Sequence, residues 1–347
     1  MINSKVINNT VISKRRTNAS LTKSCGWLLI ACASMLFSCT HVSSTHIPST
    51  HIPSKHVPSS NSSFINSSST NASDSYQAPS RQAQPKIGVQ LHSVRDAISE
   101  DFENTLIQIA DMGFDGVEFA GRYGPYNEDP KGLKTFLQSI GLELSGAHIS
   151  LKQLRGERGD KHLRFFETLG VKLLIIPYDE RANQPQHIDA LITEFAETAE
   201  RAKQRGMQLG YHNHSSEFEA FGKGTFWDYL AQNTSDDFVL QLDVGWVKFA
   251  GLDPIDYIKR YPQRTLTTHY KIRSYKGKPS SVPAGTEVIL GQNDYDWPAL
   301  IRATTEYGGT DWIIIEQEEY PEPLTPIQSV KASLNGLTQV LRDMAVE

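Results

Sequence analysis

Cysteine is scarce in this 347-residue sequence and is confined to its beginning. The three cysteines are Cys25, Cys32 and Cys39, so residues 40–347 contain no thiol. Disulfide bridges and cysteine-ligated metal sites are therefore excluded from the rest of the chain. Any metal bound there must use nitrogen and oxygen ligands.

The N-terminal apolar run is too short to cross a membrane comfortably. GWLLIACASMLF, at 26–37, has 12 residues, whereas a membrane-spanning helix needs about 20. A basic stretch precedes this run, which is typical of an export signal. Its ending, LFSC, resembles the lipobox of bacterial lipoproteins. The resemblance implies a signal peptide over residues 1–39, a lipid anchor at Cys39 and an outer-membrane location facing the periplasm. A signal peptide or signal anchor with an unrelated cysteine is the alternative.

Charged side chains are rare in residues 40–85, which are rich in Ser, Thr, Asn and Pro. The segment contains the short repeats THIPS, THIPS and KHVPS. Such a composition cannot bury enough surface to fold, so we expect a disordered linker. The histidines of the repeats offer a weak metal site at most, and a low-complexity stalk explains them better.

Basic residues are outnumbered in residues 86–347. Residues 1–85 hold 7 of the 34 basic residues and 1 of the 39 acidic residues. That leaves 27 basic and 38 acidic residues in 86–347, a net charge of −11. Nucleic-acid phosphates demand a basic surface, so no nucleic-acid partner is expected.

A glycine-rich phosphate loop is also missing after the first predicted strand, where VQLHSVRD stands. A doubly wound sheet, the rival architecture, would normally carry such a loop. Short apolar runs alternate instead with amphipathic runs such as FENTLIQIADMG (102–113) and residues 187–206, which end at Gly206. This alternation predicts an α/β fold, a (β/α)₈ TIM barrel over residues 86–347. The predicted strands are KIGVQL (86–91), GVEFA (116–120), LELSGAH (142–148), KLLIIP (172–177), MQLGYH (207–212), FVLQLD (238–243), TLTTHYK (265–271) and WIIIEQ (312–317).

Polar side chains stand at or just after the carboxyl ends of these strands, where barrel enzymes place their chemistry. Isolated buried polar groups are costly, so we expect these side chains to face the mouth of the barrel together. Because strand side chains alternate with a period of two, His212 and His214 can share a face. The positions are His92, Glu118, His148, His212, His214, Asp243, His269, Lys271, Glu316 and Glu318.

Four of these residues, from consecutive strands, form a candidate metal site: His212, Asp243, His269 and Glu316. Two imidazoles and two carboxylates suit Mn²⁺, Zn²⁺, Co²⁺, Mg²⁺ or Fe²⁺ without distinguishing among them. The plainer alternative is that each residue is a polar strand end satisfied by hydrogen bonds. Their arrival together on four strands favours one bound divalent ion.

Several motifs together resemble the xylose-isomerase-like sugar phosphate isomerase/epimerase family. They are GVQLHSVRD, GFDGVEFAG, GYHNHSSEFE, LQLDVGWVKFAGLDPIDYIKRYPQR, HYK and WIIIEQEE. The resemblance covers nearly all of residues 86–347 and implies one divalent metal at the ends of strands five to eight. The ligand pattern of the family is glutamate, aspartate, histidine, glutamate. Asp243, His269 and Glu316 match it, while His212 stands where many members have glutamate.

The resemblance also implies the chemistry and the partner, a small sugar or keto-sugar. A metal-held carbonyl would lose the neighbouring proton to a carboxylate through an enediolate, and a second group would return it. The implied catalytic residues are Glu316, His212 and Lys271. If no second base is well placed, elimination of a group β to the carbonyl is favoured instead. The predicted substrate contacts are Glu118, His148, His214, Trp246 and Glu318.

The resulting hypothesis is an exported, metal-dependent sugar isomerase or epimerase. Two alternatives stay open. The first is a metal-dependent lyase or glycosidic-bond-cleaving enzyme that acts on keto-sugars with the same metal. The second is a non-catalytic sugar-binding lipoprotein, which the complete set of candidate ligands argues against.

Overall fold

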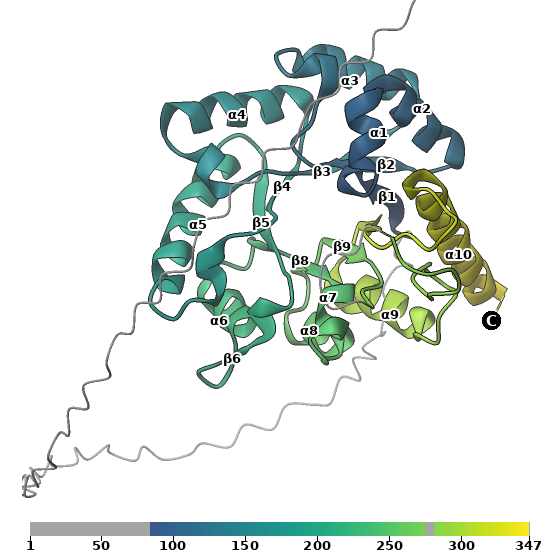
Figure 1. Ribbon diagram of the computed structural model, residues 1–347. Coiled ribbons are helices and arrows are strands. Elements are labelled where there is room, and N and C mark those ends of the chain that lie inside the picture. Colours follow the sequence, from purple (N-terminus) through teal and green to yellow (C-terminus); the bar gives the residue numbers. More distant parts are fainter. Residues whose placement is uncertain (1–83, 275–280, 347) are drawn as a thin grey trace, which may run out of the picture. The chain divides into compact units, whose positions relative to one another are not determined.

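The computed structural model describes residues 84–274 and 281–346, and within them eight parallel strands close into a barrel. The strands are hydrogen-bonded in the order β1–β10–β9–β8–β5–β4–β3–β2. Helices surround them (Figure 1). The predicted (β/α)₈ barrel is therefore confirmed, and each predicted strand overlaps an observed one. The barrel strands are β1 (Lys86–Gln90), β2 (Gly116–Phe119), β3 (Glu143–His148), β4 (Leu173–Ile176), β5 (Gln208–His212), β8 (Val239–Asp243), β9 (Thr267–Tyr270) and β10 (Trp312–Ile315).

The helices follow the apolar periodicity of the sequence and begin and end at recognisable signals. The carboxylate of Asp101 accepts a hydrogen bond from the N–H of Asn104 and so caps α2. The same helix ends at Gly113, whose φ of 95° a side chain would disfavour. The helices are α1 (Arg95–Glu100), α2 (Phe102–Met112), α3 (Pro130–Ser139), α4 (Gly156–Leu169), α5 (Ile188–Lys203), α6 (Phe226–Asn233), α7 (Val244–Phe249), α8 (Pro254–Arg260), α9 (Trp297–Ala303) and α10 (Pro326–Val346).

One small element was not predicted. β6 (Ala220–Phe221) and β7 (Gly224–Thr225) form an antiparallel hairpin outside the barrel, just before α6. Strands of two residues are too short to show any hydrophobic alternation. The hairpin could not be read from the sequence for that reason.

Two apolar layers flank the strands, as β4 illustrates. Leu174 and Ile176 belong to the main core, whereas Leu173 and Ile175 form a separate small cluster with Val239. Side chains alternate along a strand, so the two sets lie on opposite faces of β4. We assign the main core to the layer between strands and helices and the small cluster to the barrel interior. Toward the mouth, the barrel interior is lined by the polar residues at the strand ends.

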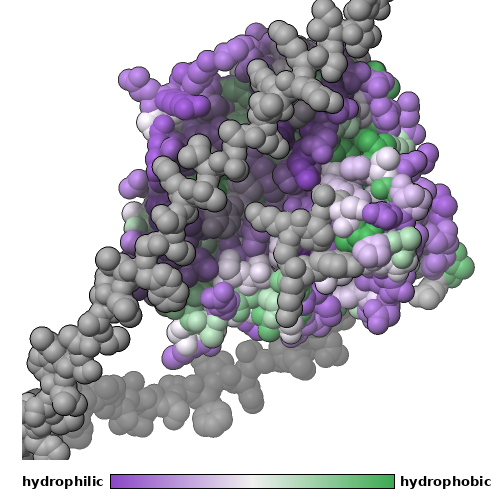
Figure 2. All heavy atoms as spheres, in the orientation of Figure 1, coloured by the Kyte–Doolittle hydropathy of each residue, from purple (hydrophilic) through white to green (hydrophobic). Residues whose placement is uncertain are grey.

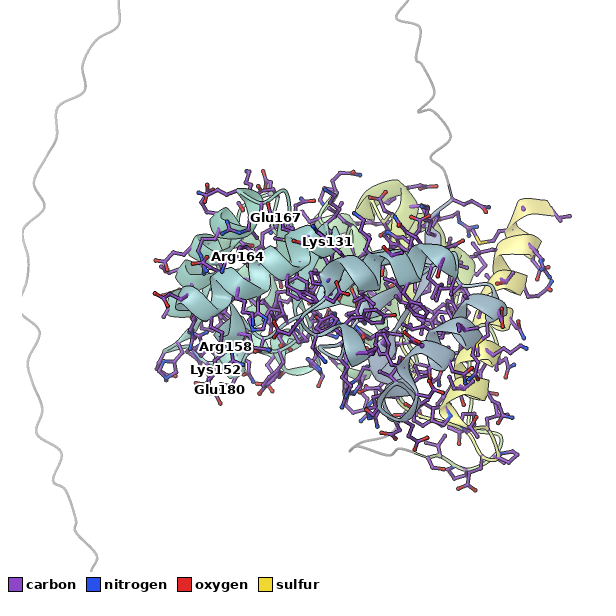
Figure 3. The ribbon with its side chains drawn as sticks, turned by 90° about the horizontal axis from the view of Figure 1, so that it is seen from above. Lys131, Lys152, Arg158, Arg164, Glu167 and Glu180 are labelled. Atoms are coloured by element: carbon purple, nitrogen blue, oxygen red, sulfur yellow. The ribbon has the colours of Figure 1, made fainter. Side chains whose placement is uncertain are left out.

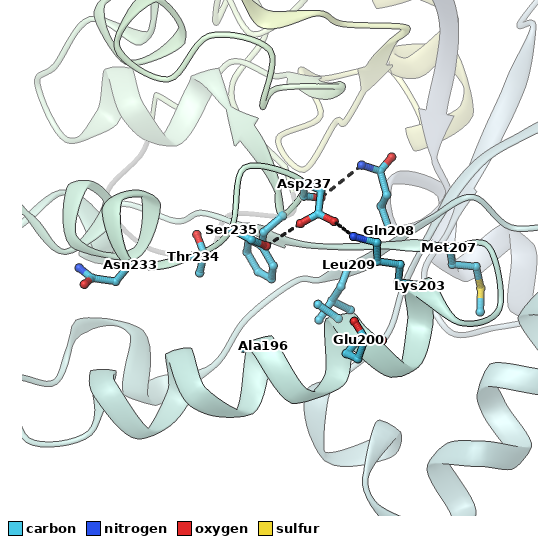
Figure 4. A pocket seen from close by; sticks show the side chains of 12 residues that line it. Ala196, Glu200, Lys203, Met207, Gln208, Leu209, Asn233, Thr234, Ser235 and Asp237 are labelled. Atoms are coloured by element: carbon cyan, nitrogen blue, oxygen red, sulfur yellow. Dashed lines mark hydrogen bonds and ion pairs between the residues drawn. The ribbon is translucent and has the colours of Figure 1, made fainter.

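A pocket of about 470 Å³ lies where β5 and β8 begin, at the end of the barrel opposite the strand-end residues (Figure 4). Its polar groups largely satisfy one another. Lys203 Nζ lies 2.7 Å from Asp237 Oδ2, and Ser235 donates to the same carboxylate at 2.6 Å. Barrel enzymes place their chemistry at the other end of the strands, so this pocket is not the candidate site.

The predicted signal peptide (1–39) and almost all of the predicted linker (40–85) fall outside the described residues. The lipid anchor at Cys39 and the export of the chain therefore stay predictions. Among the described residues, no helix is both long enough and apolar enough to span a membrane.

Candidate metal and active site

The strand ends bring the four candidate ligands together at the mouth of the barrel. His212 ends β5, Asp243 ends β8, His269 lies in β9 and Glu316 directly follows β10. One nitrogen or oxygen atom of each lies within 4.8 Å of those of the other three, and all four residues are buried. The face drawn in Figure 2 is hollowed and hydrophilic near its centre. We call these four residues the strand-end cluster.

Asp243 is fixed by backbone contacts, but one of its carboxylate oxygens has no hydrogen bond within the described residues. Its Oδ1 accepts a hydrogen bond from the N–H of Trp246 at 3.0 Å and so caps α7. The Asn213 side chain bonds both backbone groups of Asp243, at 2.9 and 3.2 Å. Asp243 Oδ2 is buried, has no hydrogen bond within the described residues and lies 3.4 Å from Lys271 Nζ. A buried carboxylate oxygen in this state is costly, and a bound cation would satisfy it.

A buried amide sets the orientation of His212. Gln241 Nε2 donates to Glu118 Oε1 at 2.7 Å, which turns the amide oxygen toward His148 Nε2 at 2.8 Å and His212 Nδ1 at 3.0 Å. A carbonyl oxygen only accepts, so His212 Nδ1 must carry a proton. The lone pair of the neutral ring then resides on Nε2, which lies 3.7 Å from Asp243 Oδ2. His212 is therefore oriented as a ligand.

Glu118 orients His269 directly. His269 Nε2 lies 2.6 Å from Glu118 Oε2, while His269 Nδ1 lies 3.1 Å from Glu316 Oε2. Burial raises the pKa of Glu118, but His148 and His269 outweigh it and hold that pKa well below its usual range. The ionised Glu118 carboxylate accepts a hydrogen bond from His269 Nε2–H. His269 Nδ1 therefore faces the strand-end cluster. Carboxylate–histidine pairs of this kind orient metal-ligating imidazoles in many proteins.

Lys271 lies among three carboxylates. Its Nζ is 3.4 Å from Asp243 Oδ2, 3.1 Å from Glu316 Oε2 and 2.5 Å from Glu318 Oε2. Burial lowers the pKa of Lys271, but these carboxylates outweigh it and raise that pKa above its usual range. Burial also opposes the charge of Glu316, yet Lys271 and then His269 hold the pKa of Glu316 well below its usual range. The mouth thus contains an ionised glutamate beside a protonated lysine.

The remaining three members of the cluster differ in protonation. Burial and the neighbouring His269 lower the pKa of His212 well below its usual value, so its ring is neutral. Burial raises the pKa of Asp243 to about 6, against the effect of Lys271. Burial lowers the pKa of His269, but Glu118 and then Glu316 outweigh it and raise that pKa to about 10. Metal binding at His269 would therefore release a proton.

The donor set fits a divalent cation. Asp243 Oδ2 has no hydrogen bond, and His212 Nε2 faces it with a lone pair. A second group, His148 with His212 and His269, is equally compact. His148 Nε2, however, lies 2.8 Å from Gln241 Oε1 and 3.1 Å from Glu118 Oε2, both acceptors, so this nitrogen carries a proton and cannot be a metal ligand. We therefore assign the metal to the strand-end cluster.

The structure corrects the role predicted for Glu118. Its side chain is 0% exposed, and its oxygens accept hydrogen bonds from Gln90, Gln241 and His269. Glu118 lies beneath the cluster and does not reach a substrate at the mouth. It fixes the ligand histidines instead.

The other predicted substrate contacts lie around the cluster. The ring of His214 lies 5.4 Å from the ring of Trp246 and 5.8 Å from that of Tyr178, which is 57% exposed. His214 Nδ1 and Trp246 Nε1 are buried without a hydrogen bond among the described residues. Glu318 is the most exposed of the three carboxylates around Lys271, and the His148 side chain is buried.

Sequence reasoning missed three amides and one aromatic residue of this site. Gln90 and Gln241 stand inside apolar strands, and Asn213 separates two histidines. An amide within an apolar strand needs a buried partner, and that signal could have identified the two glutamines. Tyr178 lies in the loop after β4, where no pattern marked it.

Glu118→Gln tests the orienting role. We expect divalent-metal affinity to fall about 10- to 100-fold, because the amide no longer accepts strongly from His269 Nε2–H. Competition against a chromophoric chelator measures this affinity. Glu143→Gln removes an exposed carboxylate paired with Lys86 and is the matched control. Equal affinity in both variants, with unchanged melting of the metal-free proteins, contradicts the assignment.

The closed parallel barrel and its buried histidine–carboxylate cluster define the chain as a (β/α)₈ barrel with a candidate metal centre at the mouth. The chain belongs to the xylose isomerase-like TIM barrel family, whose model matches residues 106–340. The predicted family is thereby confirmed.

The curated relatives and solved structures that the chain resembles include sugar-modifying enzymes. Inosose dehydratase of Lacticaseibacillus casei is 26% identical over 263 residues, which cover 65% of this chain and 85% of the relative. A sugar phosphate isomerase/epimerase from Parabacteroides distasonis superposes with a TM-score of 0.57 at 24% identity, covering 75% of this chain and 96% of that one. The zinc-bound IolI protein superposes with a TM-score of 0.53 at 14% identity, covering 74% and 98%. These two structures share the fold.

Proposed function

We propose that the chain is a divalent-metal-dependent lyase acting on an oxidised sugar or a cyclic polyol ketone. It removes the proton next to the carbonyl and expels the group β to that carbonyl. The carrying observation is that Glu316, at the mouth, has its pKa held well below its usual range beside the protonated Lys271 at 3.1 Å. The similarity to inosose dehydratases, whose name describes removal of water from an inosose, supports the proposal.

The role of each residue follows from its position in the site. A divalent ion in the strand-end cluster would polarise the substrate carbonyl as a Lewis acid. Glu316 accepts the proton from the neighbouring carbon, and Lys271 keeps Glu316 ionised before that step. Glu318 Oε2 lies 2.5 Å from Lys271 Nζ, and Glu318 is more exposed than Glu316. The Lys271–Glu318 pair is therefore placed to return a proton to the departing oxygen.

Isomerase or epimerase activity, the first prediction from the sequence, is the second candidate. An epimerase needs a proton donor on each face of the reacting carbon. His212 stands where a second glutamate is common in the family, but its Nδ1–H donates to Gln241 and its Nε2 faces Asp243. A ligand histidine in that orientation is not a base. The geometry therefore favours elimination over return of the proton to the same carbon.

Incubation of the full chain with Mn²⁺ or Zn²⁺ and an inosose in deuterium oxide tests the proposal. Proton NMR follows exchange next to the carbonyl, and ultraviolet absorbance follows the conjugated ketone that elimination produces. Exchange with formation of that product supports the lyase. Exchange or a new stereoisomer without unsaturation supports the epimerase, and no exchange with any sugar ketone overturns both.

A further inference from the structure

A second pocket extends outward from the mouth between the loop after β2 and helix α4. Its volume is about 510 Å³, which lies in the range of ligand sites. We call it the α4 groove. It begins at His148, whose ring stacks on His269 of the strand-end cluster with centroids 5.3 Å apart. The groove is therefore lined by a residue that contacts the strand-end cluster.

The α4 groove is cationic although the domain is acidic. Arg158, Lys161 and Arg164, all from α4, line it against one carboxylate, that of Glu128. Figure 3 labels Arg158 and Arg164 on this helix. Positive charge gathered in a hollow of a domain with net charge −11 favours an anionic ligand.

The two arginines are not committed to other groups. Neither the Arg158 nor the Arg164 guanidinium forms a hydrogen bond or ion pair within residues 84–274 and 281–346. Lys161 pairs with Glu128 at 2.8 Å, but both side chains are largely exposed, and such pairs contribute little stability. All three cationic side chains can therefore bind a ligand with little loss of stabilising contacts.

The groove also has an aromatic wall that suits a sugar ring. The ring of Tyr123 lies 5.0 Å from that of Phe165 and 6.1 Å from that of Phe166, and all three residues line the groove. The Tyr123 hydroxyl has no hydrogen bond to any described residue, and burial raises its pKa. A neutral hydroxyl beside aromatic faces can bind a sugar hydroxyl.

From these contacts we infer that the α4 groove binds a negatively charged sugar unit, which is the part of the substrate beyond the reacting ring. Carboxylate, phosphate and sulfate groups share the chemistry that the arginines recognise. The role as a substrate part rests on the proposed function. Under that function, the enzyme breaks the C–O bond between the carbon that is β to the carbonyl and the oxygen of the second, charged sugar unit. The proton taken from the α carbon balances the one that this oxygen gains, and the products are an unsaturated ketone and a free acidic sugar.

Binding can be measured without turnover. Calorimetric titration of the full chain with D-glucuronate, D-glucose 6-phosphate, D-glucose 6-sulfate and D-glucose compares three anions with a neutral sugar. We expect each anion to bind at least about tenfold more tightly than glucose, and Arg158→Gln with Arg164→Gln to remove that advantage. The tightest anion identifies which charged group the groove takes.

Two controls separate the groove from the metal centre. Arg302→Gln makes the same change on the exposed surface of α9 and is expected to bind as the unchanged chain does. Asp243→Asn is expected to keep anion binding, since Asp243 does not line the groove. Equal affinity for glucose and the anions, or binding that Asp243→Asn abolishes and the arginine changes leave intact, overturns the inference. Anion binding in a chain without lyase activity leaves the groove standing and refutes only the proposed function.

Discussion

Asp243→Asn is expected to weaken divalent-metal binding at least about 100-fold while the barrel stays folded. Asp243 Oδ2 is buried, has no hydrogen bond among the described residues and faces His212 Nε2 at 3.7 Å. An uncharged amide supplies a much weaker ligand to a hard or borderline cation. Elemental analysis of the purified chain, with chelator competition for affinity, measures the loss.

Asparagine is the informative replacement because Asp243 has a second role. Its Oδ1 caps α7, and asparagine caps helices about as well as aspartate, so the helix keeps its start. Alanine would remove the cap as well and cost about 1 kcal/mol. Asp253→Asn, at the exposed cap of α8, is the matched control. Full metal content in Asp243→Asn would show that the ion, if any, is bound elsewhere.

The positions of the four cluster residues could be predicted because barrel geometry dictates them. Parallel strands that close on themselves bring their carboxyl ends to one mouth, so a polar residue at each end must meet its neighbours there. His212, Asp243, His269 and Glu316 all stand at or beside such ends. Knowing only that the runs were strands in one barrel was enough to bring these residues together.

The network beneath the cluster could not be predicted in the same way. Glu118 and Gln241 lie on β2 and β8, which are not neighbours in the barrel, and their hydrogen bond spans the interior. Contacts across a barrel depend on how far each side chain reaches, which strand patterns do not specify. Glu118 therefore looked like a residue of the mouth, and its full burial was visible only in three dimensions. The α4 groove likewise depends on how a helix packs beside the loop after β2.

Glu316→Gln is expected to lower the rate of proton exchange next to the substrate carbonyl about 10²- to 10⁴-fold. The amide keeps the shape of the side chain and an oxygen for the metal, but it cannot accept a proton at neutral pH. The measurement is deuterium exchange into the substrate at saturating Mn²⁺ or Zn²⁺, so that a weaker metal affinity does not limit the rate. Under the proposed role kcat falls while KM changes little, because binding of the ground state is preserved.

The control for this change is Glu306→Gln, an exposed residue after α9 whose loss should leave exchange unaltered. Lys271→Met gives the complementary result. Lys271 is the largest influence that lowers the pKa of Glu316, so its removal raises that pKa and moves the rise of activity to higher pH. If Glu316→Gln exchanged at the unchanged rate, the base would be another group. Glu318, bonded to the same lysine at 2.5 Å, is then the residue that the geometry leaves for the role.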